Sequence, residues 1–370
     1  MTILIDGRPF VSTSAGISSF LRGALTAWAE TCPTDRFIVA LPRPTDSTFV
    51  SEGLPANVLL RDSSCRPLRR LPNLLWLMLA MPLLARRLKA DIFFSALPCV
   101  PYLLPRRTKT VIVVHDVVNI EFRETMQWTN RLANVFFSRA MRKADVLWAN
   151  SHYTRERVEH YYPARRCRDI FVGCAVDRKR FRPLTTVREE GLFDKYGIGK
   201  PFMLFVGSLE PRKNLDFLLS LMPELWRRTH TPLVVVGASG WKNSHIKAVV
   251  EAEDFPRESV VFCGFVPEDD LVMLYNTAHC FVSASLNEGF GMPQLEALLC
   301  GCPVVTARNS AMTEVAEGKQ GTVCIAGYDP QTWIDALLGV LADRPSVTRE
   351  EFSAYDWHAI VRRLLSRLAT

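Results

Sequence analysis

The sequence lacks the segments that would carry the chain across or through a membrane. Its longest apolar run, residues 74–85, is shorter than the roughly 20 residues that a helix needs to span a bilayer. Residues 1–6 read as a first β-strand and not as a secretory signal peptide. We therefore expect a cytoplasmic protein.

Cysteine patterns that bind zinc and glycine patterns that bind dinucleotides are also missing. The ten cysteines are dispersed and form no Cys-x-x-Cys pair, so neither a zinc site nor a disulfide framework is expected. No Gly-x-Gly-x-x-Gly fingerprint is present, which argues against a dehydrogenase built on paired nucleotide-binding domains. The sequence predicts no metal and no cofactor.

Charge is divided unevenly along the chain. Residues 1–185 hold 28 Lys and Arg against 15 Asp and Glu, a net charge of +13, whereas residues 186–370 hold 17 against 23, a net charge of −6. No recognition motif for nucleic acid accompanies the basic half, so we expect no nucleic-acid partner. An anionic membrane surface fits better, because an attraction of about 1 kcal/mol per basic residue needs no motif.

Short apolar runs alternate with helical segments in both halves, which is the pattern of a doubly wound parallel sheet. The sequence predicts one domain over residues 1–185, joined by a last helix at 354–370, and a second over residues 186–353. The expected strands are 2–5, 36–41, 91–94, 110–114, 145–149 and 169–172, then 202–207, 232–237, 259–263, 280–284, 303–306 and 321–325, with helices at 16–30 and 128–143 among the connections.

Residues 74–85 have two readings. They suit a buried crossover helix of the first domain, which we favour. Because Arg69, Arg70, Arg86 and Arg87 flank them, they also suit a helix that lies in a membrane interface with its basic flanks at the lipid phosphates. The nearby segment 101–107, Pro-Tyr-Leu-Leu-Pro-Arg-Arg, has similar chemistry.

Two glutamates, Glu288 and Glu296, lie on either side of a predicted helix start. Residues 287–297 read Asn-Glu-Gly-Phe-Gly-Met-Pro-Gln-Leu-Glu-Ala and follow an apolar strand. Glutamates at such a place often only cap the helix and complement its dipole. Carboxylates there can also accept hydrogen bonds from sugar hydroxyls, which indicates a nucleotide-sugar site.

The segment resembles the donor motif of the large retaining glycosyltransferase family 4. The likeness covers the glutamate spacing, the loop glycines Gly289 and Gly291, Pro293 and the Gly-x-Pro-Val-Val that follows. It implies the GT-B fold, which is α/β and has two Rossmann-like domains, an interdomain cleft and a C-terminal helix that returns to the first domain.

The resemblance also implies roles for the residues of this motif. Glu296 would bind the ribose hydroxyls and Glu288 the ring of the donor sugar. The main-chain N–H groups of Phe290 and Gly291 would meet the phosphates or the sugar. In relatives, backbone groups of the loop that corresponds to residues 264–269 read the base, so Phe265 and Val266 become the expected nucleobase neighbours.

Arg212 and Lys213 supply the cations that a diphosphate needs. They follow a strand in the segment 205–215, Phe-Val-Gly-Ser-Leu-Glu-Pro-Arg-Lys-Asn-Leu, and precede an amphipathic helix. An arginine can hold phosphate oxygens in a bidentate fork and a lysine adds a point charge, so the pair can stabilise a leaving group without a metal. The segment matches the family's diphosphate-binding loop.

Two further loops of the first half are candidates by resemblance. Gly16 lies in the first turn after a strand, where the family has a glycine loop that touches the donor phosphates. His115 and Asp116 end the strand 110–114. A lone histidine there is often structural, but in relatives it lies beside the transferred sugar, so His115 is the expected transition-state contact. Asp116 would orient it or contact the acceptor.

The sequence therefore predicts a retaining glycosyltransferase that binds a nucleotide sugar in its second domain and its acceptor in the first. Similarity of the 205–215 and His-Asp segments to bacterial surface-polysaccharide mannosyltransferases favours GDP-mannose and a glycan or lipid-linked glycan acceptor. The basic first half also suits a peripheral position on the inner face of the cytoplasmic membrane. Another hexosyl or rhamnosyl transferase, a sugar-nucleotide epimerase and a non-catalytic scaffold remain as alternatives.

Overall fold

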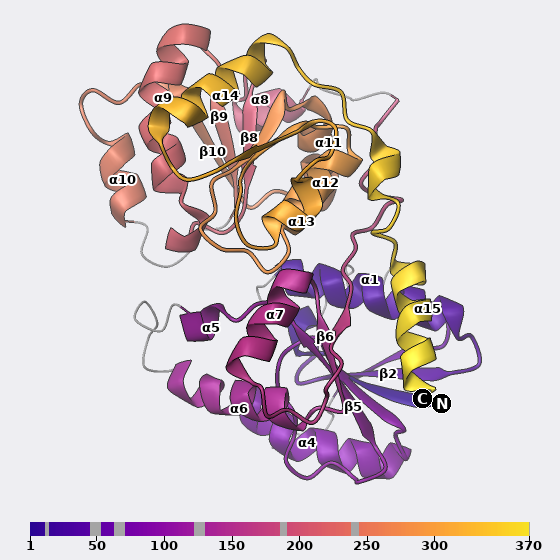
Figure 1. Cartoon of the computed structure of the whole chain (residues 1–370). Helices are drawn as coiled ribbons and strands as arrows, with labels where there is room; N and C mark the ends of the chain where they lie inside the picture. The colour runs from indigo at the N-terminus through magenta and orange to yellow at the C-terminus, as the bar shows by residue number, and fades with distance from the viewer. Residues whose placement is uncertain are drawn as a thin grey trace. The chain divides into compact units, whose positions relative to one another are not determined.

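A computed structural model gives the fold of the chain (Figure 1). It describes residues 1–11, 15–44, 53–62, 71–121, 130–185, 191–237 and 244–369. The chain forms two compact units, Met1–Val176 with Tyr355–Thr370, and Asp177–Ala354. The observed boundary between the units therefore lies between residues 176 and 177, before the predicted boundary at 185/186. Residues 177–185 belong to the second unit.

The first unit is built on a parallel sheet of seven strands. Its strands in chain order are β1 (Thr2–Asp6), β2 (Arg36–Leu41), β3 (Val58–Asp62), β4 (Ile92–Ser95), β5 (Lys109–Val114), β6 (Val146–Ala149) and β7 (Phe171–Val172). They lie side by side in the order β3-β2-β1-β4-β5-β6-β7. The sequence did not predict β3, because it is an edge strand that is only partly buried and ends in Arg61 and Asp62.

Helices cover both faces of this sheet. On one face, α4 (Asn73–Leu88), α6 (Asn130–Lys143) and α7 (His152–Tyr161) bury their apolar sides in one core. On the other, α1 (Ala15–Thr31) packs against α15 (Trp357–Leu368), where the rings of Phe20 and Trp357 lie 4.9 Å apart. The last helix thus belongs to the first unit, as the resemblance to the GT-B fold implied. The described part of the unit also contains two shorter helices, η1 (Arg8–Val11) and α5 (Val118–Glu121).

The second unit repeats the architecture with six parallel strands. They are β8 (Met203–Val206), β9 (Leu233–Val236), β10 (Val260–Gly264), β11 (Cys280–Ser283), β12 (Val304–Ala307) and β13 (Thr322–Ile325), in the order β10-β9-β8-β11-β12-β13. All six lie where the sequence predicted strands. Their helices are α8 (Leu192–Tyr196), η3 (Pro211–Lys213), α9 (Leu215–Thr229), α10 (Ser244–Val250), η4 (Arg257–Ser259), α11 (Glu268–Thr277), α12 (Met292–Leu299), α13 (Met312–Ala316), α14 (Pro330–Ala342) and η5 (Arg349–Phe352).

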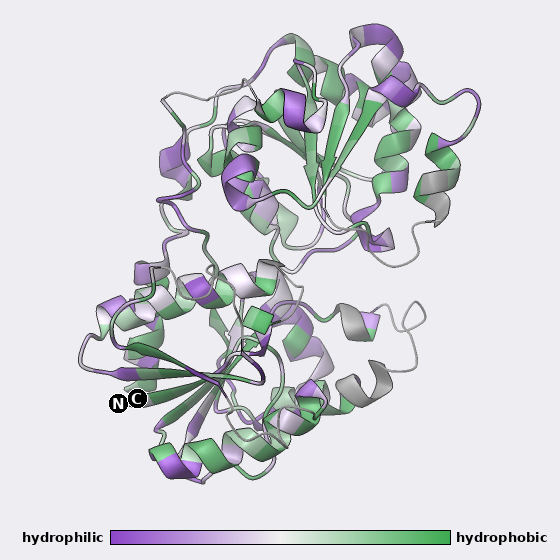
Figure 2. Ribbon diagram, turned by 180° about the vertical axis from the view of Figure 1, so that it is seen from behind, coloured by the Kyte–Doolittle hydropathy of each residue, from purple (hydrophilic) through white to green (hydrophobic). Residues whose placement is uncertain are grey.

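Buried apolar side chains hold both sheets between their helices. Figure 2 colours the strands of both units as predominantly hydrophobic. Strands covered on both faces read as continuous apolar runs, and in β9, Leu233–Val236, every residue is buried. This is the physical reason that the strands of the second unit could be found from the sequence.

Each sheet has one point at which the strand order reverses. In the first unit it lies between β1 and β4, and in the second between β8 and β11. The connections that leave two neighbouring strands there turn in opposite directions, so a crevice opens at the carboxyl ends of the strands, where α/β proteins bind ligands. The loops after β8 and β11 are therefore the first place to look for a site.

Candidate functional site

Two cations meet one carboxylate at the β8/β11 reversal. Arg212 and Lys213 lie in η3 after β8, and Glu288 lies in the loop between β11 and α12. Arg212 Nη1 donates to Glu288 Oε2 over 3.0 Å, and Lys213 Nζ forms an ion pair with Glu288 Oε1. The structure thus brings together three of the predicted site residues, which stand 75 and 76 positions apart in the chain.

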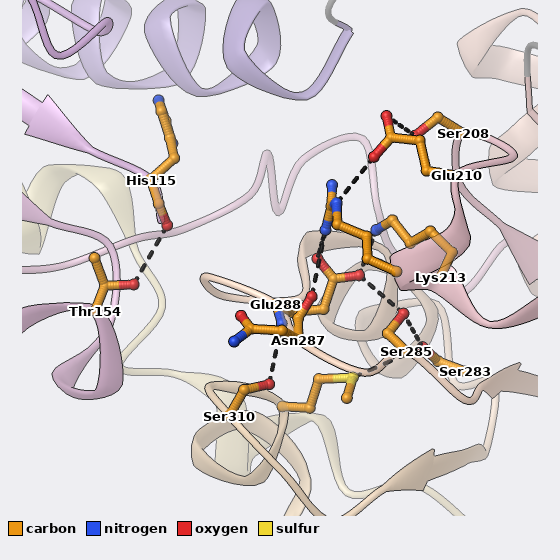
Figure 3. Close-up of polar contacts among 12 residues, drawn as sticks. His115, Thr154, Ser208, Glu210, Lys213, Ser283, Ser285, Asn287, Glu288 and Ser310 are labelled. Atoms are coloured by element: carbon orange, nitrogen blue, oxygen red, sulfur yellow. Dashed lines mark hydrogen bonds and ion pairs between the residues drawn. The ribbon is translucent and has the colours of Figure 1, made fainter. Parts of the chain in front are cut away.

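Neighbouring groups hold this cluster in place, as Figure 3 shows. Ser285 Oγ donates to Glu288 Oε1 over 3.0 Å, and the backbone N–H of Glu288 donates to Ser310 Oγ over 3.1 Å. On the other side, Arg212 Nε donates to Glu210 Oε2 over 2.9 Å. The two cations and two carboxylates balance in charge, so the cluster is neutral as a whole.

The charges around Glu288 determine its protonation state. Burial disfavours the ionised form, but the positive charges of Lys213 and Arg212 outweigh burial and lower the pKa of Glu288 from 4.5 to about 2. The carboxylate is therefore ionised throughout the physiological range. A carboxylate with so low a pKa is a weak base, and both of its oxygens are already bound by cations.

A cavity of about 10 Å³ adjoins the cluster, lined by residues that include Lys213, Ser283, Glu288 and Gln294. That volume suits about one water molecule.

Glu296 lies in α12 and has a different environment from Glu288. The hydroxyl of Tyr275, on α11, donates to Glu296 Oε2 over 2.9 Å. Burial raises the pKa of Glu296 to about 7, although the Tyr275 hydrogen bond acts in the opposite direction. Its carboxyl group is thus close to half protonated at neutral pH, and a ligand that donates hydroxyl hydrogens would favour the ionised form.

The start of α12 lies between the two glutamates. Gly291 takes a φ of +92° immediately before the helix, a conformation that only glycine adopts without strain. Phe290 is buried, which anchors the loop that contains Gly289. In the first turn of α12, Pro293 has no N–H group, and the N–H groups of Gln294 and Leu295 donate to the carbonyl oxygen of Gly291 over 3.2 and 3.3 Å.

Phe265 and Val266, the predicted neighbours of a base, follow β10 and differ in exposure. The side chain of Phe265 is 74% exposed, whereas that of Val266 is buried at 5%. Only Phe265 therefore offers an aromatic surface to a ligand, and Val266 contributes its side chain to the interior.

In the first unit, His115 directly follows β5 at the carboxyl edge of the sheet. Its Nε2 lies 2.9 Å from the carbonyl oxygen of Ala96, and its Nδ1 lies 3.3 Å from the amide nitrogen of Asn150. These partners assign the proton to Nε2, which donates to Ala96, while Nδ1 accepts from Asn150. Burial lowers the pKa of His115, so the imidazole is neutral.

The remaining predicted residues of the first unit lie close to the carboxyl edge. Asp116 follows His115 directly, and Gly16 is exposed in the first turn of α1. The preceding residues of the predicted glycine loop, 12–14, lie outside the described part of the chain. Ser151 caps α7 by accepting from the N–H of Thr154 over 2.9 Å.

Several residues that shape these sites were not predicted. They are Glu210, Ser285 and Ser310 around Arg212 and Glu288, Tyr275 beside Glu296, and Asn150 beside His115. Glu210 was inside a recognised motif and could have been suggested from its spacing to Arg212. Tyr275 and Ser310 come from other elements, so no local pattern points to them.

No group of three or more His, Cys, Asp or Glu side chains that could hold a metal ion occurs in the ranges that the structure describes. The same ranges contain no helix both long and apolar enough to cross a membrane.

Comparison with protein families identifies the two halves of the chain. Residues 36–180 match a model described as "Glycosyltransferase Family 4", and residues 189–356 match one described as "Glycosyl transferases group 1". Together these matches cover well over half of the chain, and they contain Arg212, Lys213, Glu288 and Glu296. The chain belongs to glycosyltransferase family 4.

Similar proteins agree with this membership. Over 181 residues this chain is 35% identical to the O-antigen chain mannosyltransferase B of Escherichia coli. The match covers 48% of this chain and 44% of that protein. Over 213 residues this chain is 28% identical to the mannosyltransferase WbdA of Escherichia coli, covering 56% and 26%. The chain thus spans less than half the length of these two curated relatives.

Solved structures share the fold across the whole chain. Sucrose-phosphate synthase from Thermosynechococcus elongatus superposes with a TM-score of 0.75 at 17% identity, covering 100% of this chain and 98% of that one. HepE from Anabaena, in complex with UDP-glucose, superposes with a TM-score of 0.73 at 16% identity, covering 100% and 99%. The two Rossmann-like units of this glycosyltransferase therefore form the GT-B fold.

Proposed function

We propose that this glycosyltransferase moves a hexose from a nucleotide sugar to a glycan or lipid-linked glycan acceptor, with retention of anomeric configuration. The observation that carries the proposal is the pairing of Arg212 and Lys213 with Glu288 at the β8/β11 reversal. A nucleoside diphosphate that leaves a sugar gains negative charge, and two preorganised cations stabilise that charge in the transition state.

The same contacts argue for a positioning role of Glu288. A nucleophilic carboxylate needs an oxygen that can approach the anomeric carbon. Here Arg212 binds Oε2, while Lys213 and Ser285 bind Oε1. The remaining lone pairs of these oxygens can accept from sugar hydroxyls. We therefore assign Glu288 to the ring of the donor sugar, with the departing diphosphate as the group that accepts the acceptor's proton.

The other residues of the second unit would hold the nucleotide. Glu296 would accept hydrogen bonds from the ribose hydroxyls, and the N–H groups of Phe290 and Gly291 would meet the phosphates or the sugar. The exposed ring of Phe265 would lie beside the base. The N–H groups of Phe290 and Gly291 would help the site to bind a diphosphate without a metal ion.

His115 fits a contact to the transferred sugar because it is neutral and its orientation is defined by Ala96 and Asn150. Both ring nitrogens already have protein partners, so the contact would be made by the neutral ring itself, which does not repel a developing positive charge on the sugar. In the first unit, Gly16 would contribute backbone N–H groups to the phosphates, and Asp116 would face the acceptor.

We propose mannose from GDP-mannose as the first donor to test. The support comes from relatives named as mannosyltransferases, among them one from Mycolicibacterium smegmatis that is described as GDP-mannose-dependent and is 34% identical over 212 residues. HepE, which shares the fold, was solved with UDP-glucose, so uridine nucleotides form the comparison arm.

A thermal-shift screen of the full chain over nucleoside diphosphates and their sugars would identify the base, because a ligand that binds only the native state stabilises it. A transfer assay with the stabilising donor then follows, with and without glycan acceptors. Sugar conversion without an acceptor would indicate an epimerase, and binding with no turnover of any donor would indicate a scaffold.

Arg212→Ala tests the site itself. Loss of one transition-state cation should lower the transfer rate by about 100-fold to 1000-fold. Arg228→Ala is the matched control, because Arg228 is a solvent-exposed arginine of the same unit that pairs with Glu224 on α9. Equal activity of the Arg212 variant and the parent would refute the proposed site.

A further inference from the structure

An apolar and basic surface lies on the outer side of α4, a helix of the first unit. The inner side of this helix buries Trp76, Leu77 and Met81 in the core. The outer side carries Leu75, Leu79 and Leu83, which are 51%, 49% and 59% exposed. Their spacing of four residues aligns them on one face, where they form a stripe about 12 Å long.

Two further segments on the same side of the first sheet also expose apolar side chains. The crossover of residues 97–108 carries Tyr102 and Leu103, which are 51% and 64% exposed. Tyr102 packs against α6, with its ring under the guanidinium of Arg139 at 4.0 Å. Figure 1 shows α4 and α6 on the same side of the first sheet, and both contribute to one core cluster.

We call α4, residues 97–108 and α6 together the leucine surface. Six of the eleven large hydrophobic side chains that are exposed in the described part of the chain lie on it. They are Leu75, Leu79, Leu83, Tyr102, Leu103 and Val135. Figure 2 shows hydrophobic residues along most of α4. Such a concentration of exposed apolar side chains marks an interaction site.

The charges of the leucine surface are all of one sign. Residues 73–89, 97–108 and 130–143 contain no Asp or Glu. The same three segments carry exposed basic residues, namely Arg86, Arg87, Lys89, Arg106, Arg107, Arg142 and Lys143. Apolar side chains bordered by long basic ones match the interface of an anionic bilayer, in which leucines enter the acyl boundary and arginines reach the phosphates.

We infer that the leucine surface docks the protein in the plane of an anionic lipid membrane. This combines the two readings of residues 74–85, because α4 is a crossover helix whose inner face is core and whose outer face meets lipid. The inference goes beyond the proposed reaction and does not depend on it, since none of the predicted donor residues lies on this surface.

A second copy of the chain fits the leucine surface less well. A twofold dimer brings the same patch of both copies together. The basic residues of one copy would then lie opposite those of the other, and juxtaposed like charges oppose association. A bilayer that contains anionic lipids supplies the opposite charge and an apolar interior at once.

Flotation of the full chain with vesicles tests the inference. The parent should float with vesicles of phosphatidylcholine mixed with phosphatidylglycerol and remain behind with phosphatidylcholine alone. Raised salt should weaken the binding. Arg86→Gln/Arg87→Gln should weaken partition by about 30-fold, from two residues at about 1 kcal/mol each. The control Arg227→Gln/Arg228→Gln, on exposed arginines of the second unit, should bind like the parent.

The apolar part is tested by Leu75→Ser/Leu79→Ser/Leu83→Ser, which should lower binding at least about tenfold. Phe262→Ser, at a phenylalanine of the second unit that is 42% exposed, serves as its control. The inference is overturned if the parent does not float with anionic vesicles, or if the leucine variant binds as well as the parent. It is also overturned if sedimentation shows a dimer of the parent that the leucine variant loses, or if only an acidic protein binds this surface.

Discussion

Replacing Glu288 with glutamine tests the charge cluster at the β8/β11 reversal most directly. The amide has the same shape as the carboxylate but lacks the negative charge with which both Arg212 and Lys213 form ion pairs. Lys213 is only 9% exposed, so the variant leaves a buried ammonium group without its counter-ion. Breaking a buried pair in this way is strongly destabilising.

The magnitude follows from the pKa of Glu288, which the cations lower from 4.5 to about 2 despite burial. At about 1.4 kcal/mol per pKa unit, the ionised carboxylate stabilises the folded second unit by about 3 kcal/mol. Because the folded pKa lies below the unfolded one, this stabilisation is complete above pH 4.5 and is lost as the pH falls toward 2.

Urea unfolding followed by tryptophan fluorescence measures the effect. At neutral pH the free energy of unfolding of Glu288→Gln should be lower than that of the parent by about 3 kcal/mol, and the difference should shrink near pH 3. A nucleoside diphosphate should raise the midpoint of the variant at least as much as that of the parent, because its phosphates replace the missing negative charge. Hexose transfer should be lost.

Glu210→Gln is the matched control for this experiment. Glu210 bonds Arg212 but not the buried lysine, and its side chain is 24% exposed. Its replacement should cost less than about 1 kcal/mol. If Glu288→Gln unfolds within about 0.5 kcal/mol of the parent at neutral pH, or if the difference does not depend on pH, the reasoning about the cluster is wrong.

Two further changes test packing and protonation elsewhere. Glu296→Gln should gain stability relative to the parent as the pH rises from 4.5 to about 7, because the raised pKa of Glu296 makes the parent lose stability over that range; urea midpoints that move together across this range would contradict it. Gly23→Ala should destabilise the first unit by about 1–3 kcal/mol in a thermal melt, since the added methyl group would clash with the indole of Trp357. Gly339→Ala, whose new methyl group meets open space, should be neutral or slightly stabilising, and equal losses from both variants would refute the packing argument.

Local pattern was sufficient for most of the fold and for the principal site residues. Buried parallel strands are continuous apolar runs, and polar residues directly after them lie at the ligand-binding edge of the sheet. Arg212, Lys213 and Glu288 could therefore be placed at the ends of β8 and β11 from their positions in the sequence. The edge strand β3 was missed because partial exposure removes that signal.

Only the tertiary structure decided which of these residues meet and in what state. The order of strands brings β8 beside β11, and that adjacency joins Arg212 and Lys213 to Glu288. The neighbours of the two buried glutamates then give them different pKa values, because Lys213 and Arg212 lower the pKa of Glu288 whereas burial beside the hydroxyl of Tyr275 raises that of Glu296. Residues 74–85 of α4 are all apolar, so only packing against the sheet shows that Leu75, Leu79 and Leu83 remain uncovered. Contacts between distant elements and the desolvation they impose leave no local pattern to read.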